Sequence, residues 1–213
     1  MIAAVEECAK NDSNIISLSI GSSTSTKFEA KVYERLLEKE NILVIAAGGN
    51  TGDSAYSYPS SYEHVMSVAA VNASGRKAKF SSFNDKVDIA AAGVNVYSTL
   101  PNNRYGFMSG TSFSSPYIVG AAALIWSFDT SKSAKDVWNA LVATANDKGE
   151  PGYDEKFGHG TVNTLEAAKM FGYQPSCTDT PVNWSLNLLT SSAVSYTHLR
   201  AHETKANVVC RLL

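Results

Sequence analysis

The chain has 213 residues, enough for one sizeable domain with a buried core. A hydrophobic content of 44%, a charged content of 18% and a formal net charge of −2 give no reason to expect nucleic acid or an anionic membrane as a partner. No apolar run approaches the roughly 18 residues of a membrane-spanning helix. The N-terminus also lacks the basic region and apolar stretch of a signal peptide.

The first part of the chain alternates helical and strand patterns. Residues 2–10 have helical spacing, and residues 15–20 alternate apolar side chains with serines, as a strand does. Residues 28–40 place their apolar side chains on one face, which predicts an amphipathic helix. Residues 42–47 form a continuous apolar run, typical of a central parallel strand. This order predicts an α/β fold of three layers with a doubly wound, mostly parallel sheet.

The middle of the chain continues this pattern. Two short apolar runs, 65–71 and 87–92, lie between turn-rich loops and are predicted to be further strands. Residues 120–126, GAAALIW, are apolar on every side and therefore belong to a buried helix.

Two more helices are expected towards the C-terminus. Residues 133–145 open with Ser133 and Asp136 in the spacing of a capping box, and residues 163–170 form a short closing helix. The chain then becomes rich in Pro, Ser and Thr, which predicts a linker over residues 172–193.

The last residues, 194–213, differ from the rest of the chain. They contain VSYTHLRAHET and VCRLL, and they resemble the in-frame translation of a sequencing adapter with its primer site. We therefore expect this segment not to be native and exclude it from the fold prediction. The alternative is a natural helical tail.

The strongest local signal is GTSFSSP at residues 110–116, which opens directly into the apolar helix. A serine at the start of a helix lies near free backbone N–H groups and the positive end of the helix dipole. That position suits a nucleophile whose attack creates an oxyanion. An ordinary Ser or Thr helix cap is the alternative.

Two strand ends carry a second signal. AAGGN at residues 46–50 places an amide side chain where a strand opens into a loop, at the edge where open α/β folds bind ligands. SIG at residues 19–21 ends the neighbouring strand, and its backbone could pair with an extended peptide. A plain strand-to-loop turn is the alternative for both.

Taken together, these motifs resemble the subtilase family of serine proteases. The resemblance runs from residue 2 to about residue 168, with motifs in the family's order. They are SLSIG (17–21), VIAAGGNTG (44–52), YPSSYEHVMSVAAV (58–71), FSSFNDKVDIAAAGVNVYSTLP (80–101), GTSFSSP (110–116) and FGHGTVNTLEAA (157–168). The resemblance implies a subtilisin-like fold, so residues 1–171 are expected to form part of a peptidase domain that is truncated on its N-terminal side.

The resemblance also implies site residues. Ser112 matches the nucleophile, Asn50 the side-chain donor of the oxyanion hole, and Thr111 its support. The backbone N–H of Ser112 would be the second oxyanion donor. The pocket for the substrate side chain would be formed by two walls and a floor: Ser19, Ile20 and Gly21; Ala47, Gly48 and Gly49; and Ser57 near the floor.

The catalytic base is not evident in this chain. Subtilisins carry their Asp and His before the Ser, and only His64 precedes Ser112, in a segment that matches a non-catalytic loop. His159 lies in GHGT, which is similar to the motif of the catalytic His, but Val162 stands where a second His would be. We therefore expect Met1 to be an internal methionine of a longer reading frame that holds both partners.

The resemblance suggests one ion and no required cofactor. Three carbonyls and one carboxylate match a weak cation site of some family members, which would suit Ca²⁺ or an alkali ion. They belong to Ser60, Tyr62, Val65 and Asp88. The bond between Tyr58 and Pro59 matches one that is cis in subtilisins.

The sequence thus predicts a serine endopeptidase acting on peptide or protein substrates through an acyl-enzyme, incomplete and inactive in this chain alone. No nucleic acid or membrane partner is expected, and the resemblance implies a secreted or lumenal protein. The alternative is a pseudoprotease that binds peptides or partners without cleaving them. A lipase-type hydrolase is excluded because no G-x-S-x-G pattern occurs.

Overall fold

The computed structural model describes residues 1–175 and the strand at 208–212. A parallel five-stranded sheet, in the order β4-β3-β2-β1-β7, forms the centre of the fold. Its strands are β1 (Ser13–Leu18), β2 (Leu43–Ala47), β3 (Met66–Val71), β4 (Ile89–Ala92) and β7 (Val208–Leu212). A separate antiparallel hairpin joins β5 (Val96–Leu100) to β6 (Arg104–Met108) and was not predicted from the sequence.

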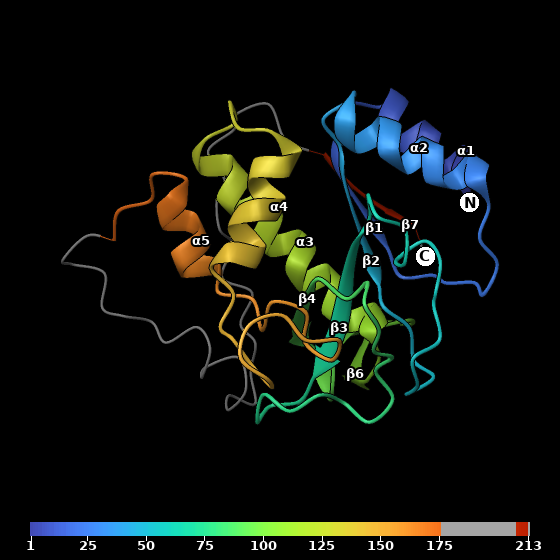
Figure 1. Cartoon of the computed structure of the whole chain (residues 1–213), viewed down its shortest axis with the longest axis vertical. Coiled ribbons are helices and arrows are strands. Elements are labelled where there is room, and N and C mark those ends of the chain that lie inside the picture. Colours follow the sequence, from blue (N-terminus) through green and yellow to red (C-terminus); the bar gives the residue numbers. More distant parts are fainter. Residues whose placement is uncertain (176–207, 213) are drawn as a thin grey trace.

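Helices cover the sheet on both faces, which gives three layers (Figure 1). On one face lie α1 (Ile2–Lys10) and α2 (Lys27–Glu38). On the other lie α3 (Thr111–Phe128), α4 (Ala134–Ala143) and α5 (Thr164–Met170). The apolar runs are buried on both faces: every residue of β2 and β3 is buried. Burial on both faces is what a continuous apolar strand requires, and the predicted α/β architecture is confirmed.

One strand end differs from the prediction and one helix start agrees with it. Strand β1 ends at Leu18, where its pairing with β2 stops opposite Ala46, so Ser19 to Gly21 form a loop instead of continuing the strand. Helix α3 begins at Thr111, so the serine of GTSFSSP lies at the start of a helix as expected, and several polar residues of its first turns are buried. Both ends place polar residues at the carboxyl edge of the sheet.

The capping box of α4 is confirmed. The Ser133 hydroxyl accepts the Asp136 N–H at 3.1 Å, and the Asp136 carboxylate accepts the Ser133 N–H at 2.8 Å. The peptide bond between Tyr58 and Pro59 is cis, as the resemblance implied.

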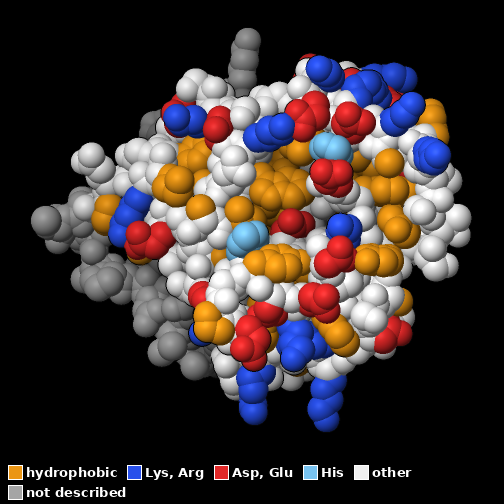
Figure 2. Space-filling model, viewed as in Figure 1, with side chains coloured by type: hydrophobic (Ala, Val, Ile, Leu, Met, Phe, Trp, Pro, Cys, Tyr) orange, Lys and Arg blue, Asp and Glu red, His pale blue; other side chains and the backbone are white. Residues whose placement is uncertain are grey.

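Most of the predicted linker (172–193) and tail (194–213) lies outside the described residues, so the domain boundaries stay predictions. Within the described part, no helix is both long and apolar enough to cross a membrane. On the face shown in Figure 2, basic and acidic side chains are interspersed, in keeping with the small net charge of −2.

Candidate active site

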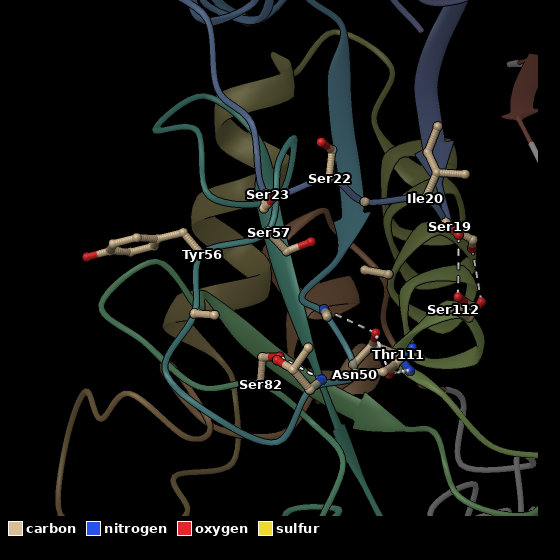
Figure 3. Close-up of a pocket in the computed structure, with 15 residues that line it drawn as sticks. Ser19, Ile20, Ser22, Ser23, Asn50, Tyr56, Ser57, Ser82, Thr111 and Ser112 are labelled. Atoms are coloured by element: carbon tan, nitrogen blue, oxygen red, sulfur yellow. Dashed lines mark hydrogen bonds between the residues drawn. The ribbon is translucent and has the colours of Figure 1, made fainter.

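The carboxyl ends of β1 and β2 meet the N-terminus of α3 at a cavity of about 330 Å³ (Figure 3). In a parallel sheet neighbouring strands open at the same edge, so the loops that follow β1 and β2 lie side by side. The cavity is lined by Ser19, Ile20, Gly21, Ser22, Ser23, Ala47, Gly49, Asn50, Thr51, Ala55, Tyr56, Ser57, Ser82, Thr111 and Ser112. Four stretches that are separate in the sequence therefore form one site.

Ser112 is the second residue of α3 and is partly exposed at the cavity. Pro116 lies four residues later and has no N–H, so the Ser112 carbonyl lacks its usual partner within the helix. The Ser19 hydroxyl donates to that carbonyl at 3.0 Å instead. The Ser112 hydroxyl has only a long contact of 3.4 Å with the Ser19 carbonyl. The serine's backbone is thus held while its Oγ remains available.

Asn50 is oriented by Thr111. The amide oxygen of Asn50 accepts the Thr111 N–H at 2.9 Å and the Thr111 hydroxyl at 3.0 Å. The Gly49 N–H in turn donates to the Thr111 Oγ1 at 3.3 Å. These bonds fix the oxygen end of the carboxamide, and no described residue accepts a hydrogen bond from its Nδ2. The Asn50 amine is therefore a donor fixed in direction and without an acceptor in the part of the chain that the structure describes.

A second donor faces the same space. The backbone N–H of Ser112 lies in the first turn of α3, where a helix offers no internal acceptor. A point at the ideal Cβ position of Gly110 lies 3.6 Å from the Asn50 Nδ2 and 3.8 Å from the Ser112 nitrogen. The two donors thus flank one small region, which the absence of a side chain at Gly110 keeps open. Such an arrangement can bind an oxygen atom that gains negative charge.

The structure brings together nearly all the residues that the sequence singled out. Ser19, Ile20 and Gly21 line one side of the cavity, and Ala47 and Gly49 line the other. Gly48 does not line it, because this buried residue turns its N–H to the Val68 carbonyl at 2.9 Å. Ser57 contributes its side chain to the cavity, on the side away from the start of α3 (Figure 3).

Sequence reasoning missed several lining residues, namely Ser22, Ser23, Thr51, Ala55, Tyr56 and Ser82. Ser22 and Ser23 follow the predicted wall of residues 19–21, and Thr51 follows Asn50, so that adjacency is a usable signal. Ser82 carries no such signal: it reaches the cavity because its hydroxyl bonds the Thr51 hydroxyl at 2.9 Å and the Thr51 N–H at 3.3 Å.

No acidic, basic or histidine side chain lines the cavity. His64 lies 3.7 Å from Glu38, a residue of helix α2, and His159 packs edge-on against the Tyr153 ring with centroids 5.4 Å apart. Neither histidine of the described residues reaches Ser112. The expectation that the catalytic base lies outside this chain stays a prediction.

The predicted cation site is distinct from this cavity, since Asp88 does not line it. Burial raises the pKa of Asp88 to about 7, against the opposing effect of the Ser67 N–H, which donates to its carboxylate at 2.7 Å. The Tyr62 carbonyl already accepts the Val65 N–H at 3.1 Å. No group of three acidic, His or Cys side chains that could hold a metal occurs among the described residues. One carboxylate with carbonyls fits a weak oxygen-ligand site only.

Comparison with known sequences points to one family. The sequence profile of the subtilase family matches residues 1–160. Subtilisin DY of Bacillus licheniformis is 35% identical over 173 residues, which cover 79% of this chain and 62% of that protein. A thermostable alkaline protease of Halalkalibacterium halodurans is 36% identical over 165 residues, which cover 78% of this chain and 45% of that protein. The chain thus spans less than two thirds of the length of these curated relatives.

Solved structures give the same result for the fold. The prenylagaramide maturation protease PagA has a TM-score of 0.73 at 30% identity, with 79% of this chain and 66% of that chain covered. The psychrophilic subtilisin-like protease Apa1 from the Antarctic Pseudoalteromonas sp. AS-11 also has a TM-score of 0.73, at 20% identity, with 79% and 72% covered. These likenesses confirm the predicted subtilisin-like fold.

Proposed function

The chain belongs to the subtilase family of serine proteases, and from that premise we propose that the complete protein is an endopeptidase with Ser112 as its nucleophile. The observation that carries the proposal is the convergence of three groups on one space: the Ser112 hydroxyl, the Ser112 N–H and the Asn50 amine. A nucleophile beside two unpaired donors is the arrangement that acyl transfer needs.

In the proposed reaction the Ser112 Oγ attacks the carbonyl carbon of the scissile peptide bond and gives its proton to a base. The carbonyl oxygen becomes an oxyanion between the Asn50 Nδ2 and the Ser112 N–H. Collapse of this intermediate expels the amine, which takes the proton, and leaves an ester on Ser112. Water then attacks that ester through the same sequence of steps, with water as the nucleophile and the Ser112 Oγ as the leaving group. The two donors contribute because they need no reorientation as charge develops.

The base and the group that orients it are proposed to belong to a part of the complete protein that this sequence does not include. Subtilases place an Asp and a His before the nucleophile, and neither described histidine lies at the cavity. We therefore expect residues 1–171 to be part of a peptidase domain and to have at most residual activity alone. What remains without the triad partners is the contribution of the oxyanion donors and of substrate binding.

The proposed substrate is an extended peptide. The loop of residues 19–21 and that of residues 47–49 run along the cavity on either side of the space where Ser112 acts. Backbone groups of such loops can pair with a peptide as added strands do. Neither nucleic acid nor a membrane is a proposed partner, and a secreted or lumenal location is proposed from the family.

A serine-directed probe tests the function. The complete reading frame would be expressed as wild type, Ser112→Ala and Ser109→Ala, the last being a nearby serine outside the cavity. We expect a fluorophosphonate to label the wild type and Ser109→Ala, and not Ser112→Ala. Labelling that survives in Ser112→Ala would reject Ser112 as the nucleophile. A folded wild type that neither labels nor cleaves peptides would instead indicate a pseudoprotease.

A further inference from the structure

A second hollow, of about 500 Å³, shares no lining residue with the active-site cavity. Its lining includes three basic side chains, Arg76, Lys77 and Lys79, together with Asn72, and it includes no acidic side chain. The whole chain has slightly more acidic than basic residues, 20 against 18, so this lining is a local concentration of positive charge. A hollow lined by charges of one sign concentrates their field and attracts ions of the opposite sign.

The three basic side chains of the hollow lack a counter-charge. None of them forms an ion pair with a carboxylate in the part of the chain that the structure describes. The Lys77 ammonium is partly buried and held in place, because it donates to the carbonyls of Ala78 at 3.1 Å and Ser81 at 2.6 Å. Burial and the nearby charge of Lys156 lower the pKa of Lys77. The charged form of Lys77 is therefore disfavoured where it lies, and an anion bound in the hollow would stabilise it.

Asn72 adds a neutral donor that is already oriented. Its side-chain oxygen accepts the N–H of Ser74 at 2.9 Å and the N–H of Arg76 at 3.1 Å. The backbone N–H of Asn72 also donates to the Arg76 carbonyl at 2.9 Å, which closes a tight turn. These bonds fix the oxygen end of the amide, and no described residue accepts a hydrogen bond from its Nδ2. The turn thus presents one free amide donor beside the cationic side chains.

The hollow adjoins the active site. A Cβ atom built on Gly52 would lie 2.7 Å from the Lys79 carbonyl oxygen, so this part of the lining packs against the loop that follows β2. Val94, which also lines the hollow, follows Gly93, whose carbonyl accepts the Gly110 N–H at 2.8 Å. Two segments of the lining therefore contact the two segments that carry the oxyanion donors. A peptide bound at the active site passes close to this positive charge.

We propose that the hollow lined by Asn72, Arg76, Lys77 and Lys79 is an anion site that binds a carboxylate or phosphate group. Cationic side chains and an amide N–H are the donors that such oxygen anions accept from. The anionic group has two possible sources: a free ion in solution, or an acidic side chain of a peptide bound at the active site. The second source rests on the proposed peptidase function, whereas the first is independent of it.

The first arm of the test is a calorimetric titration with inorganic phosphate at constant low ionic strength. It uses the complete protein as Ser112→Ala, which prevents self-cleavage. The double variant Arg76→Gln with Lys79→Gln is compared with a matched control, Lys27→Gln with Lys31→Gln, two exposed residues of α2 that do not line the hollow. Both double variants lower the net charge equally. We expect the first to weaken phosphate binding by at least about tenfold and the control by less than about twofold, because charge contacts act locally at a partly exposed site.

Asn72→Asp sharpens this arm. The aspartate retains the side-chain oxygen that accepts the N–H groups of Ser74 and Arg76, so the turn should persist and thermal melts should show a folded protein. It replaces the amide donor with a negative charge inside the hollow. We therefore expect Asn72→Asp to bind phosphate at least about tenfold more weakly than its parent.

The second arm distinguishes the two sources of the anion. Peptides that carry either Glu or Gln at one position after another are bound to the complete Ser112→Ala protein. A peptide preferred as Glu by at least about fivefold, displaced by phosphate and no longer preferred in the Arg76→Gln and Lys79→Gln variant would identify the substrate as the source. Phosphate binding without any preference for Glu would identify a free ion. If phosphate binds but no peptide does, the anion site stands and the proposed peptidase function fails. The inference is overturned if neither phosphate nor any Glu peptide loses affinity in that variant relative to the control.

Discussion

Replacing Thr111 with Val tests whether this buried residue acts through Asn50. Val has nearly the shape of Thr but lacks the hydroxyl, so the change removes hydrogen bonds without opening a cavity. Thr111 is fully buried, and its Oγ1 takes part in two contacts: it donates to the Asn50 oxygen at 3.0 Å and accepts the Gly49 N–H at 3.3 Å. The backbone N–H of residue 111 still donates to Asn50 at 2.9 Å. The carboxamide therefore keeps one of its two anchors.

The size of the effect follows from these contacts. A hydrogen bond contributes a net of about 0.5–1.5 kcal/mol. Losing the short bond to Asn50 and the long bond from Gly49 should therefore weaken the force that orients the Asn50 amide by about 1–2 kcal/mol. If that cost falls on the transition state, kcat decreases by about five- to thirtyfold. KM should change little, because the amine matters most once the oxyanion has formed. Asn50→Ala removes the donor itself and should lower kcat by about 10²–10³, a magnitude known from a bacterial subtilisin rather than calculated for this chain.

The assay is steady-state hydrolysis of one peptide by the complete protein in five forms: wild type, Thr111→Val, Thr111→Ser, Asn50→Ala and the double variant of Thr111→Val with Asn50→Ala. Thr111→Ser retains the hydroxyl and should recover most of the rate. Because Thr111 is a positioning residue, its hydroxyl should have no effect once Asn50 is gone, so the double variant should match Asn50→Ala. A further decrease of five- to thirtyfold in the double variant would refute the argument, as would a Thr111→Val enzyme with the wild-type kcat.

Three further predictions concern the stability of the complete protein. Gly158 has φ +62°, and a Cβ there would overlap the Asp88 carbonyl, so Gly158→Ala should lower the free energy of unfolding by at least about 2 kcal/mol. Gly152 has φ +87° with no atom within 4 Å, so Gly152→Ala should cost only the backbone strain of about 1 kcal/mol. Equal losses of the two variants in denaturant melts would contradict this. Ser133→Ala should cost about 1 kcal/mol through the lost cap to Asp136, and no change in unfolding midpoint would contradict it. Calcium at about 10 mM should stabilise the wild type by about 1 kcal/mol and Asp88→Asn hardly at all, as seen in thermal melts; equal shifts would exclude Asp88 as a ligand.

The elements with regular patterns were predictable from the sequence, and those defined by tertiary contacts were not. The run at residues 42–47 had to be a buried strand because no polar residue interrupts it, and β2 covers Leu43–Ala47. The start of α3 was predicted from the GTSFSSP motif, but the burial of the Ser and Thr side chains in its first turns was not, because a pattern of apolar residues does not reveal it. Their burial depends on partners that are distant in the sequence. The Ser115 hydroxyl, for example, lies 3.5 Å from the carbonyl oxygen of Ile45.

The site shows the same division. The resemblance named Ser112, Asn50 and Thr111 as its support, but it does not say which atoms meet. In the structure Thr111 holds the oxygen of Asn50 and leaves the nitrogen without an acceptor among the described residues. The resemblance placed Ser57 near the pocket floor, but its contact with Gly21 could not be predicted, because it depends on how the loop between Asn50 and Tyr58 folds back over the cavity. Short motifs identify reacting groups, whereas orientation and pocket depth come from pairs of segments that no local pattern connects.

The spacing of Ser112 and Pro116 explains how the nucleophile is connected to both strands. Proline four residues after the serine removes the N–H that would have bonded the serine's carbonyl, and a helix tolerates that loss only if another donor replaces it. The Ser19 hydroxyl does so at 3.0 Å from the loop after β1, while the Thr111 bonds to Asn50 join the same helical turn to the loop after β2. The first turn of α3 is thereby fixed to both walls of the cavity. A substrate that displaces either wall must also displace the reacting serine, so the precision of binding and the precision of attack depend on the same few hydrogen bonds.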